Sequence, residues 1–543
     1  MNNKFVSVLR APDRDFGCTE ASPFRFEEIR EHDASGAVKF DYKVENNSAK
    51  ITVYPSGSPV KFLKLRFRGD LSFVDKVYGD TWERSGSNCF IEWRSVMAGR
   101  IMPWFCYLKG AGITKCYGVK TGPDCFASWM VDVHGITLLL NLTNGSGGTD
   151  LKEPILACEV VELEGEEGED TYNVAKRFSA MLCDAPKLPK EPVFGVNNWY
   201  WAYGKISHES VMTETDYLMQ MCKGSKHRPY MIIDDGWQMC RTYGVGAYIG
   251  GPWLPNEKFG DMARTAEAIH EKGAKAGLWF RPLLTLGDVP EEAKLDKFQA
   301  GGVILDPSHP YTLERVEKDA ATIRSWGYDL IKHDFSCIDY FAAPQLTAEN
   351  SNSGLYKRSK QPYDKTKTNA TIIKNFYKAI QKGAGEADVI GCNAIGHLLA
   401  SIHSTYRTGN DTSGRSFEWT RRLGVNSIMR LPLNDTFYRA DPDCAAFTER
   451  VDPDLNLDYL ELCAVTGMTT LASVTPGILT DEQMKRINEI YLRADRDEDR
   501  YGIANYDKTS NPNVFVNADG SEKKEYNWES AYDGARVVID WFN

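Results

Sequence analysis

The chain has 543 residues, which is too long for one hydrophobic core, and at roughly 100–200 residues per domain it predicts two or three domains. Hydrophobic residues make up 42% of the chain, charged residues 26% and aromatic residues 12%, proportions that exclude a disordered or fibrous protein. The formal net charge of −11 argues against nucleic acid or an anionic membrane as the main partner.

The first residues, MNNKFVSVLRAPDRDFG, hold no basic segment followed by an apolar stretch, so we expect no signal peptide, although a removed leader stays open. No run of about 18 apolar residues predicts a membrane-spanning helix. The thirteen cysteines are odd in number and contain no CxxC pair, which fits reduced thiols better than a disulfide framework. We therefore expect a cytoplasmic protein.

Residues 1–185 contain short segments rich in β-branched and aromatic residues, separated by Gly, Asp, Asn and Ser turns. Examples are KFDYKV (39–44), VKFLKLRF (60–67) and ITLLLNLTN (136–144). Many short strands with turn signals predict an N-terminal β-sandwich domain. The stretch APKLPKEP (185–192) holds three prolines and favours an extended linker, so we place the domain boundary there.

Residues 190–490 alternate apolar strand segments with amphipathic helical stretches. Four helical stretches space their apolar residues by three and four and end at a glycine: 209–224, 262–273, 314–327 and 370–383. Eight strands are predicted at 193–204, 229–237, 276–284, 328–336, 388–396, 404–411, 436–443 and 469–476. This alternation predicts a catalytic (β/α)8 TIM barrel, making the whole a multidomain α/β protein.

A doubly wound open sheet is the alternative to the barrel. No GxGxxG or P-loop motif follows an early strand, which argues against it. Residues 491–543 predict a short C-terminal β-rich appendage, which we expect to pack on the barrel.

Polar and aromatic residues gather at the predicted carboxyl ends of the strands, where barrel enzymes build their active sites. In strand order these residues are Trp199, Trp201, Asp234, Asp235, Trp237, Trp279, Arg281, Lys332, His333, Asp334, Cys392, Asn393, Arg407, Asp411, Asp441 and Asp443. Carboxylates and basic groups ringed by tryptophans suit a sugar, because polar groups bind its hydroxyls and indole faces cover its C–H surface.

The spacing within the fourth strand is informative. Lys332 and Asp334 are two positions apart and project to the same side, whereas His333 points toward the helices. The Lys332 ammonium would keep Asp334 ionised, as a nucleophile requires. If Asp411 faces Asp334 across the barrel mouth, repulsion would raise the pKa of Asp411 and let it hold a proton for a leaving group. That pairing is the arrangement used in glycoside hydrolysis.

Each feature also has a purely structural interpretation. The Asp-Asp pair at 234–235 is common as a helix cap or turn, and the Asp-Pro-Asp at 441–443 as a turn. Arg407 and Asp411 can form a structural ion pair, and the tryptophans can be ordinary core residues. Their coincidence at predicted strand ends is what favours an active site.

Four segments in order resemble glycoside hydrolase families 36 and 27, the α-galactosidase or melibiase group: IIDDGWQ (232–238), LIKHDFS (330–336), RTGND (407–411) and ADPDC (440–444). The resemblance covers about residues 190–480. The preceding region, with YGDTWERSG (78–86) and YGVKTGP (117–123), is more similar to family 36, whose members carry such a domain before the barrel.

The resemblance implies a retaining α-galactosidase that works through a covalent glycosyl-enzyme. We expect no cofactor and no metal. Asp334 matches the nucleophile of the family's Lys-x-Asp motif, and Asp411 matches the acid/base of its Arg-x-x-x-Asp motif. Matched positions that would bind or enclose the sugar are Asp234, Asp235, Trp237, Lys332, Arg407, Trp199, Trp201, Trp279 and Asp443.

The chain also departs from these families. Some members have a Cys two positions beyond the nucleophile, where this chain has Ser336, with Cys337 one position later. Relatives vary in the loop after strand 5, here Cys392-Asn393, which lies near the substituent at the second carbon of the sugar. The specificity therefore stays open between galactose, N-acetylgalactosamine and another α-linked sugar.

Three rival functions stay open. They are transglycosylation, a sugar-binding barrel without catalysis, and a metal enzyme using Asp234, Asp235, Asp441 and Asp443. The presence of both carboxylates argues against the second, and the absence of HExxH, CxxC or EF-hand spacing argues against the third. We expect an oligosaccharide or glycoside as partner, neither nucleic acid nor membrane, and leave homo-oligomer formation open.

Overall fold

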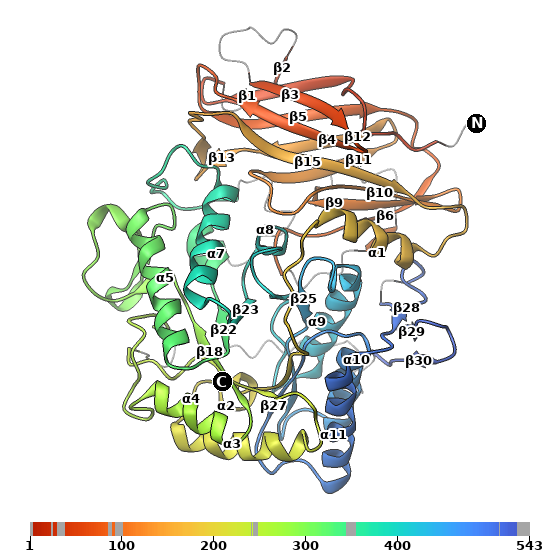
Figure 1. Ribbon diagram of the computed structural model, residues 1–543. Coiled ribbons are helices and arrows are strands. Elements are labelled where there is room, and N and C mark those ends of the chain that lie inside the picture. Colours follow the sequence, from red (N-terminus) through yellow and green to blue (C-terminus); the bar gives the residue numbers. More distant parts are fainter. Residues whose placement is uncertain are drawn as a thin grey trace.

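A computed structural model describes residues 4–22, 25–29, 38–84, 90–92, 101–240, 242, 248–343, 355–509 and 511–528. Figure 1 shows stacked antiparallel strands from the N-terminal part of the chain lying against one side of a helix-ringed region, with a small group of strands from the C-terminal part beside it. No helix among these residues is long and apolar enough to cross a membrane.

The N-terminal region contains two antiparallel sheets. One has the strand order β2-β1-β5-β12-β11-β8 and the other β3-β4-β15-β10-β9-β6-β7. The strands of the first are β1 (Arg14–Thr19), β2 (Glu27–Glu28), β5 (Val60–Arg68), β8 (Met102–Pro103), β11 (Phe126–Asp132) and β12 (Gly135–Asn141). Those of the second are β3 (Lys39–Glu45), β4 (Ser48–Tyr54), β6 (Val74–Gly79), β7 (Phe90–Glu92), β9 (Phe105–Gly110), β10 (Ile113–Val119) and β15 (Ile155–Glu164).

The two sheets pack face to face over a shared core. Along β5, Leu63, Leu65 and Phe67 are fully buried and alternate with partly exposed residues, as a half-buried strand requires. The ring of Tyr42 in β3 lies 5.9 Å from the ring of Phe67, centroid to centroid, which joins one sheet to the other. The predicted N-terminal β-sandwich is confirmed. A short hairpin of β13 (Thr143–Asn144) and β14 (Gly147–Gly148) and helix α1 (Thr171–Leu182) complete this region.

The next region is a parallel sheet with the strand order β25-β24-β23-β22-β18-β17-β16-β27-β26. Its strands are β16 (Phe194–Asn197), β17 (Tyr230–Ile233), β18 (Lys275–Phe280), β22 (Leu330–His333), β23 (Asp388–Gly391), β24 (Thr405–Arg407), β25 (Arg439–Asp441), β26 (Cys444–Phe447) and β27 (Thr470–Val474). Each of the eight predicted segments overlaps one of these strands.

The two ends of this sheet are joined by the chain itself. β25 pairs with β24, and β26 pairs with β27, yet only Pro442 and Asp443 separate β25 from β26. The two halves therefore act as one bent seventh strand, and the sheet closes as a barrel, which confirms the predicted (β/α)8 fold. Sequence reasoning missed β26, because proline lacks an N–H for the ladder and interrupts the strand pattern.

Helices surround the barrel, and side-chain caps start several of them. They are α2 (Trp199–Ala202), α3 (His208–Met221), α4 (Met262–Glu271), α5 (Pro310–Ser325), α6 (Ser336–Phe341), α7 (Asn369–Ala384), α8 (Gly396–Leu399), α9 (Phe417–Met429), α10 (Pro453–Val465) and α11 (Asp481–Arg496). Asp261 caps α4, for example, by accepting from the backbone N–H of Ala263 at 2.9 Å. A small sheet of β19 (Leu284–Thr285), β20 (Lys294–Lys297) and β21 (Val303–Leu305) follows β18.

One predicted helix end is displaced. We expected Gly383 to terminate its helix, but it lies inside α7, and Gly385, with φ of +58°, follows the last helical residue. A Cβ atom at Gly383 would lie 2.1 Å from the backbone oxygen of Glu317 in α5. Gly383 is therefore a packing position between two helices rather than a helix end.

The C-terminal part adds a small antiparallel sheet of β28 (Gly502–Ile503), β29 (Val514–Val516) and β30 (Lys523–Glu525). The Tyr506 hydroxyl donates to the backbone oxygen of Met429, at the end of α9, at 2.8 Å. This contact confirms that the appendage packs on the barrel. The boundaries placed near 185 and 490 remain predictions.

The sandwich is anchored to the barrel through α8. The ring of His397 stacks on Trp104 with centroids 4.7 Å apart, and its Nε2 contacts the backbone oxygen of Val119 at 2.8 Å. The backbone N–H of Gly122 donates to the backbone oxygen of His397 at 2.9 Å. This packing positions the segment 80–84, which follows β6, toward the barrel residues described below.

Candidate active site

Three strands of the barrel bring polar side chains together at their carboxyl ends. The ammonium of Lys332, in β22, donates to Oδ2 of Asp234, which directly follows β17, at 2.7 Å. The amide of Asn197, the last residue of β16, donates to the same oxygen at 2.7 Å. Burial lowers the pKa of Lys332, but the charge of Asp234 and the other acidic groups around the ammonium together raise it more and leave it above its usual value. Lys332 therefore stays charged in this buried position.

Asp334 follows β22, and its carboxylate is oriented by three donors. Its Oδ2 accepts from the indole Nε1 of Trp279 at 3.2 Å, and its Oδ1 accepts from the backbone N–H of Phe335 at 2.7 Å and from the amide of Asn393. Burial raises the pKa of Asp334, but the charges of Arg84 and Lys332 lower it further, so the net shift is downward. The group is thus held as a carboxylate, the form that a nucleophile needs.

His333 points away from this cluster, as the strand alternation predicts. Its Nδ1 contacts the Ser336 hydroxyl at 3.0 Å, and its ring lies 5.7 Å from that of Tyr377 in α7. Burial lowers the pKa of His333 to about 4, so the ring is neutral at physiological pH. His333 belongs to the packing between the barrel and α7.

Asp411 is bound by two arginines. Its Oδ1 accepts from Nη2 of Arg407 at 3.0 Å and from Nη1 of Arg84 at 2.6 Å, and 56% of its side chain is exposed. Desolvation raises the pKa of Asp411, but Arg84 and Arg407 outweigh desolvation and hold the pKa well below its usual range. The predicted upward shift of the Asp411 pKa by repulsion from Asp334 is therefore wrong for the free enzyme. The two guanidinium groups lower this pKa by more than the charge of Asp334 raises it.

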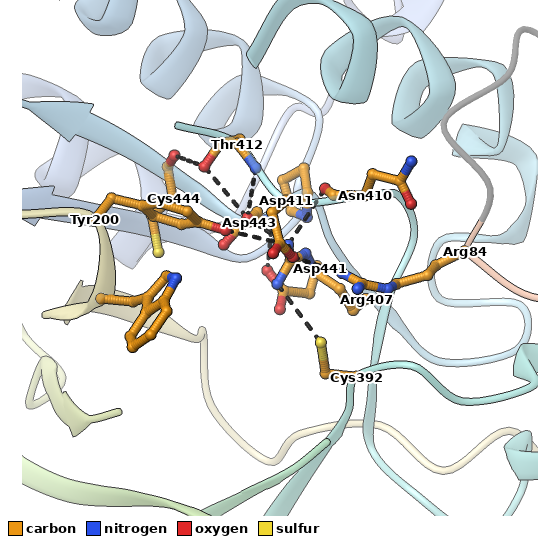
Figure 2. Close-up of polar contacts among 12 residues, drawn as sticks. Arg84, Tyr200, Cys392, Arg407, Asn410, Asp411, Thr412, Asp441, Asp443 and Cys444 are labelled. Atoms are coloured by element: carbon orange, nitrogen blue, oxygen red, sulfur yellow. Dashed lines mark hydrogen bonds and ion pairs between the residues drawn. The ribbon is translucent and has the colours of Figure 1, made fainter. Parts of the chain in front are cut away.

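Arg84 reaches this site from outside the barrel. It lies after β6 of the sandwich, and Figure 2 shows its side chain extending toward Asp411 and Arg407. Its Nε donates to the amide oxygen of Asn393 at 2.7 Å. A continuous chain of hydrogen bonds therefore runs from Asp334 through Asn393 and Arg84 to Asp411. Sequence reasoning did not select Arg84, although it lies in the YGDTWERSG segment noted for its family likeness.

Asp443 lies between the halves of the bent seventh strand and has φ of +66°. Its Oδ2 accepts from Arg407, from the Tyr200 hydroxyl and, at 2.9 Å, from the backbone N–H of Thr412 (Figure 2). Arg407 also donates to the Cys392 thiol at 3.7 Å. Asp443 thus fixes Arg407, which in turn contacts Asp411. Tyr200 also contacts Asp443 and was not predicted from the sequence.

The tryptophans that were predicted to enclose the sugar lie partly in the site and partly in the core. Trp279 contacts Asp334, but Trp237 is fully buried and donates from Nε1 to the backbone oxygen of Trp279 at 2.8 Å. Trp253, which sequence reasoning missed, packs on both indoles, with ring centroids 6.0 Å from Trp237 and 5.9 Å from Trp279.

Trp199 and Trp201 lie on α2 rather than on the predicted strand. Residues two apart share a side of a strand but point about 200° apart on a helix, so the two indoles diverge. Trp201 donates from Nε1 to Glu214 of α3 at 2.9 Å, away from the strand ends. Trp199 is half-buried, and its ring centroid lies 5.6 Å from that of Tyr203.

Other predicted residues are held by neighbours. Arg281 forms a buried ion pair with Asp339 at 2.5 Å, which occupies its guanidinium. Asp235 accepts from the Gln238 amide at 2.6 Å, and Asp441 accepts from the Thr469 hydroxyl at 2.9 Å. Within the described ranges, no three His, Cys, Asp or Glu side chains group as a metal site would require.

The cluster contains the groups for acid–base and nucleophilic chemistry at one centre. Asp334 is an oriented carboxylate, Asp411 is a second carboxylate open to solvent, and Lys332, Asp234 and Asn393 supply donors and acceptors around them. A polar hydroxylated ligand suits such a lining.

The sequence matches no family model. One curated relative, an α-galactosidase from Oryza sativa subsp. japonica, is 25% identical over 154 residues. The aligned part spans 28% of this chain and 31% of that relative.

Solved structures are similar over most of the chain. An α-galactosidase from Thermus thermophilus, TtGalA in complex with p-nitrophenyl α-D-galactopyranoside, matches with a TM-score of 0.60 at 19% identity, covering 90% of this chain and 95% of that one. The GH36 α-galactosidase AgaA from Geobacillus stearothermophilus, in complex with stachyose, matches with a TM-score of 0.58 at 13% identity, covering 89% and 71%. The chain therefore has the fold of the GH36 α-galactosidases and resembles an α-galactosidase in part of its sequence.

Proposed function

We propose that this chain is a retaining α-glycoside hydrolase and that its substrate is an α-galactoside. The observation that carries the proposal is the pairing of Asp334 and Asp411 through Asn393 and Arg84 at the carboxyl ends of the barrel strands. The likeness to TtGalA, whose structure holds p-nitrophenyl α-D-galactopyranoside, supports galactose as the sugar.

In the first step, a carboxylate oxygen of Asp334 attacks the anomeric carbon and forms a glycosyl ester. The bond from that carbon to the leaving oxygen breaks, and Asp411, protonated in the substrate complex, transfers its proton to this oxygen. Trp279 and Asn393 orient the attacking carboxylate. Because Asp334 stays ionised, it can act without a base of its own.

In the second step, Asp411 removes a proton from a water molecule, which attacks the same carbon. The ester bond to Asp334 breaks, the carboxylate is regenerated, and two inversions give net retention. This mechanism needs the two carboxyl groups roughly 5–5.5 Å apart in the substrate complex, against roughly 6.5–9.5 Å for an inverting enzyme.

The remaining groups suit recognition of the sugar ring. Asp234, with Lys332 and Asn197 on one of its oxygens, offers acceptors and donors for hydroxyls on one side. Cys392 and Asn393 lie on the loop after β23, where the resemblance predicts the substituent of the second sugar carbon. A larger N-acetyl group there would distinguish an α-N-acetylgalactosaminidase from an α-galactosidase.

The test is a panel of p-nitrophenyl α- and β-glycosides with purified protein. We expect release of nitrophenol from the α-galactoside, no release from the β-galactoside, and α-galactose as the first product by NMR. Preference for the N-acetylgalactosaminide would reassign the sugar, and transfer to added acceptor sugars in place of hydrolysis would reassign the reaction. Calorimetric sugar binding without turnover would contradict catalysis.

A further inference from the structure

Two guanidinium groups share one oxygen of Asp411, and they are held differently. Arg407 is 1% exposed and is fixed by Asp443 and Cys392 within the barrel. Arg84 is 11% exposed and comes from the sandwich, so a rotation of its side chain alone would break its contact with Asp411 while Arg407 stays in place.

The segment before Arg84 is fastened to the barrel by Arg430. Arg430 follows the last residue of α9, and its side chain is buried. Its Nε and Nη2 donate to Oδ1 of Asp80 at 2.8 and 2.5 Å, and Nη2 also donates to the Thr81 hydroxyl at 2.6 Å and to the backbone oxygen of Glu83 at 2.9 Å. One arginine thus secures residues 80–83.

The same arginine also secures the segment that carries Asp411. Nη1 of Arg430 donates to the backbone oxygen of Thr408, between Arg407 and Asp411. Arg430 therefore positions both Arg84 and Asp411. Their 2.6 Å contact follows from the way the sandwich and the barrel pack together.

This contact conflicts with one step of the proposed reaction. Hydrogen bonds from two guanidinium groups favour the ionised form of Asp411, yet the first step needs a proton on this residue. Because the Asp411 side chain is 56% exposed, it can take up a proton from solvent once one of the arginines withdraws.

We propose that Arg84 controls the protonation of Asp411: it holds this residue as a carboxylate in the free enzyme and releases it when a glycoside binds. Arg84 is thus a positioning residue supplied by the sandwich, and this role rests on the proposed function. After the first step, renewed contact with Arg84 would stabilise the Asp411 carboxylate that is left once the leaving group has taken its proton.

Other charged and titratable groups around Asp411 also affect its pKa. They are Arg407, Lys332, Asp334, Tyr200 and Tyr203. The positive charges of Arg407 and Lys332 stabilise the ionised form of Asp411, whereas the negative charge of Asp334 destabilises it. Removal of Arg84 takes one positive charge out of these surroundings. An arginine beside an aspartate lowers its pKa by about 1–3 units, so loss of Arg84 is expected to raise the pKa of Asp411 by about one unit or more.

The experiment compares Arg84→Met, Arg84→Lys and wild type in the pH dependence of kcat/KM for an α-galactoside with an alkyl leaving group. The basic limb of this profile reports the free enzyme's general acid. We expect Arg84→Met to move the basic limb upward by about one pH unit or more, and Arg84→Lys to keep it near wild type. The control is Arg66→Met, which removes a sandwich arginine paired with Asp132 and leaves the site untouched.

A lowered kcat with an unmoved basic limb in Arg84→Met would overturn the proposal, because a merely structural role predicts that outcome. Titration of Asp411 by NMR with isotope-labelled aspartate, assigned by the signal lost in Asp411→Asn, gives a readout without turnover. If wild type hydrolyses no glycoside, the proposed function fails, and this titration still decides the inference. An Asp411 pKa equal in wild type and Arg84→Met would refute it.

Discussion

Trp279 donates its indole N–H to Oδ2 of Asp334 at 3.2 Å, and the two residues stand side by side because β18 and β22 are paired with Trp279 opposite Lys332. The strand register therefore fixes one donor on the proposed nucleophile. A hydrogen bond to a charged group is worth about 1.5–3 kcal/mol, so the contact is large enough to affect catalysis.

Replacement of Trp279 by phenylalanine is expected to remove this donor while keeping most of the packing on Trp253. We expect kcat/KM to fall roughly ten- to hundredfold. Because the lost bond favours the carboxylate, the pKa of Asp334 should rise and the acidic limb of the pH profile should move upward. An unchanged acidic limb would show that the indole contributes packing alone. Trp326→Phe, on a partly buried ring that contacts Trp237 rather than Asp334, is the matched control.

The Asp334→Asn variant is expected to lose turnover, since an amide cannot form the glycosyl ester. In Asp334→Gly, azide should enter the vacated space and attack from the same face as the carboxylate. The expected product is β-galactosyl azide, identified by NMR. An α-galactosyl azide would contradict the assigned face of attack, and His333→Gln, which alters the neighbour that points toward α7, serves as the control for local disturbance.

Asp411→Asn should separate substrates by leaving group. For alkyl galactosides, which need a proton on the departing oxygen, we expect kcat/KM to fall by roughly 10²–10⁴. For a dinitrophenyl galactoside the loss in the glycosylation step should be much smaller, because its phenolate leaves unaided. Steady-state kinetics on both substrates provides the measurement, and an equal loss on both would remove Asp411 from the acid role.

Arg430 and Asp80 form a buried ion pair at 2.5 Å that joins barrel to sandwich. Removal of one partner of such a pair leaves an uncompensated charge and costs roughly 3–5 kcal/mol. We expect Arg430→Met to lower the Tm of the protein clearly in thermal unfolding. The double variant Asp80→Asn with Arg430→Met should recover part of that loss, because no buried charge is then left alone. A neutral effect of Arg430→Met would mean that water replaces the arginine.

Because the carboxyl group of Glu214 is buried, we expect the stability of the protein to depend on pH. Glu214 is 1% exposed on α3, accepts from Trp201, and burial raises its pKa to about 8. The folded state therefore binds a proton that the unfolded chain releases above its ordinary pKa of about 4.3. Stability from this group is present at low pH and is lost as pH rises to about 8, by a few kcal/mol.

We expect Glu214→Gln to remove this loss, so that its Tm exceeds that of wild type at pH 8 and approaches it near pH 4.5. Differential scanning calorimetry across this range is the measurement. Glu209→Gln, at the start of the same helix, is the exposed control, and equal Tm profiles for wild type and Glu214→Gln would contradict the buried protonated state.

Local sequence patterns determined the barrel and the placement of residues along its strands. The alternation through β22 put Lys332 and Asp334 on one side and His333 on the other, and the contacts follow that order. Such patterns are readable because strand geometry repeats every two residues and the apolar positions follow the burial of each element.

Only the tertiary structure decided which polar groups meet. Arg84 and Asp411 lie 327 positions apart, and no local periodicity links a sandwich loop to a barrel loop. Arg281 is taken up by Asp339, and Trp201 turns to Glu214 because a helix replaces the expected strand. The charge environment of Asp411, and with it the direction of its pKa shift, follows from these long-range contacts, since electrostatic interactions depend on distance in space rather than along the chain.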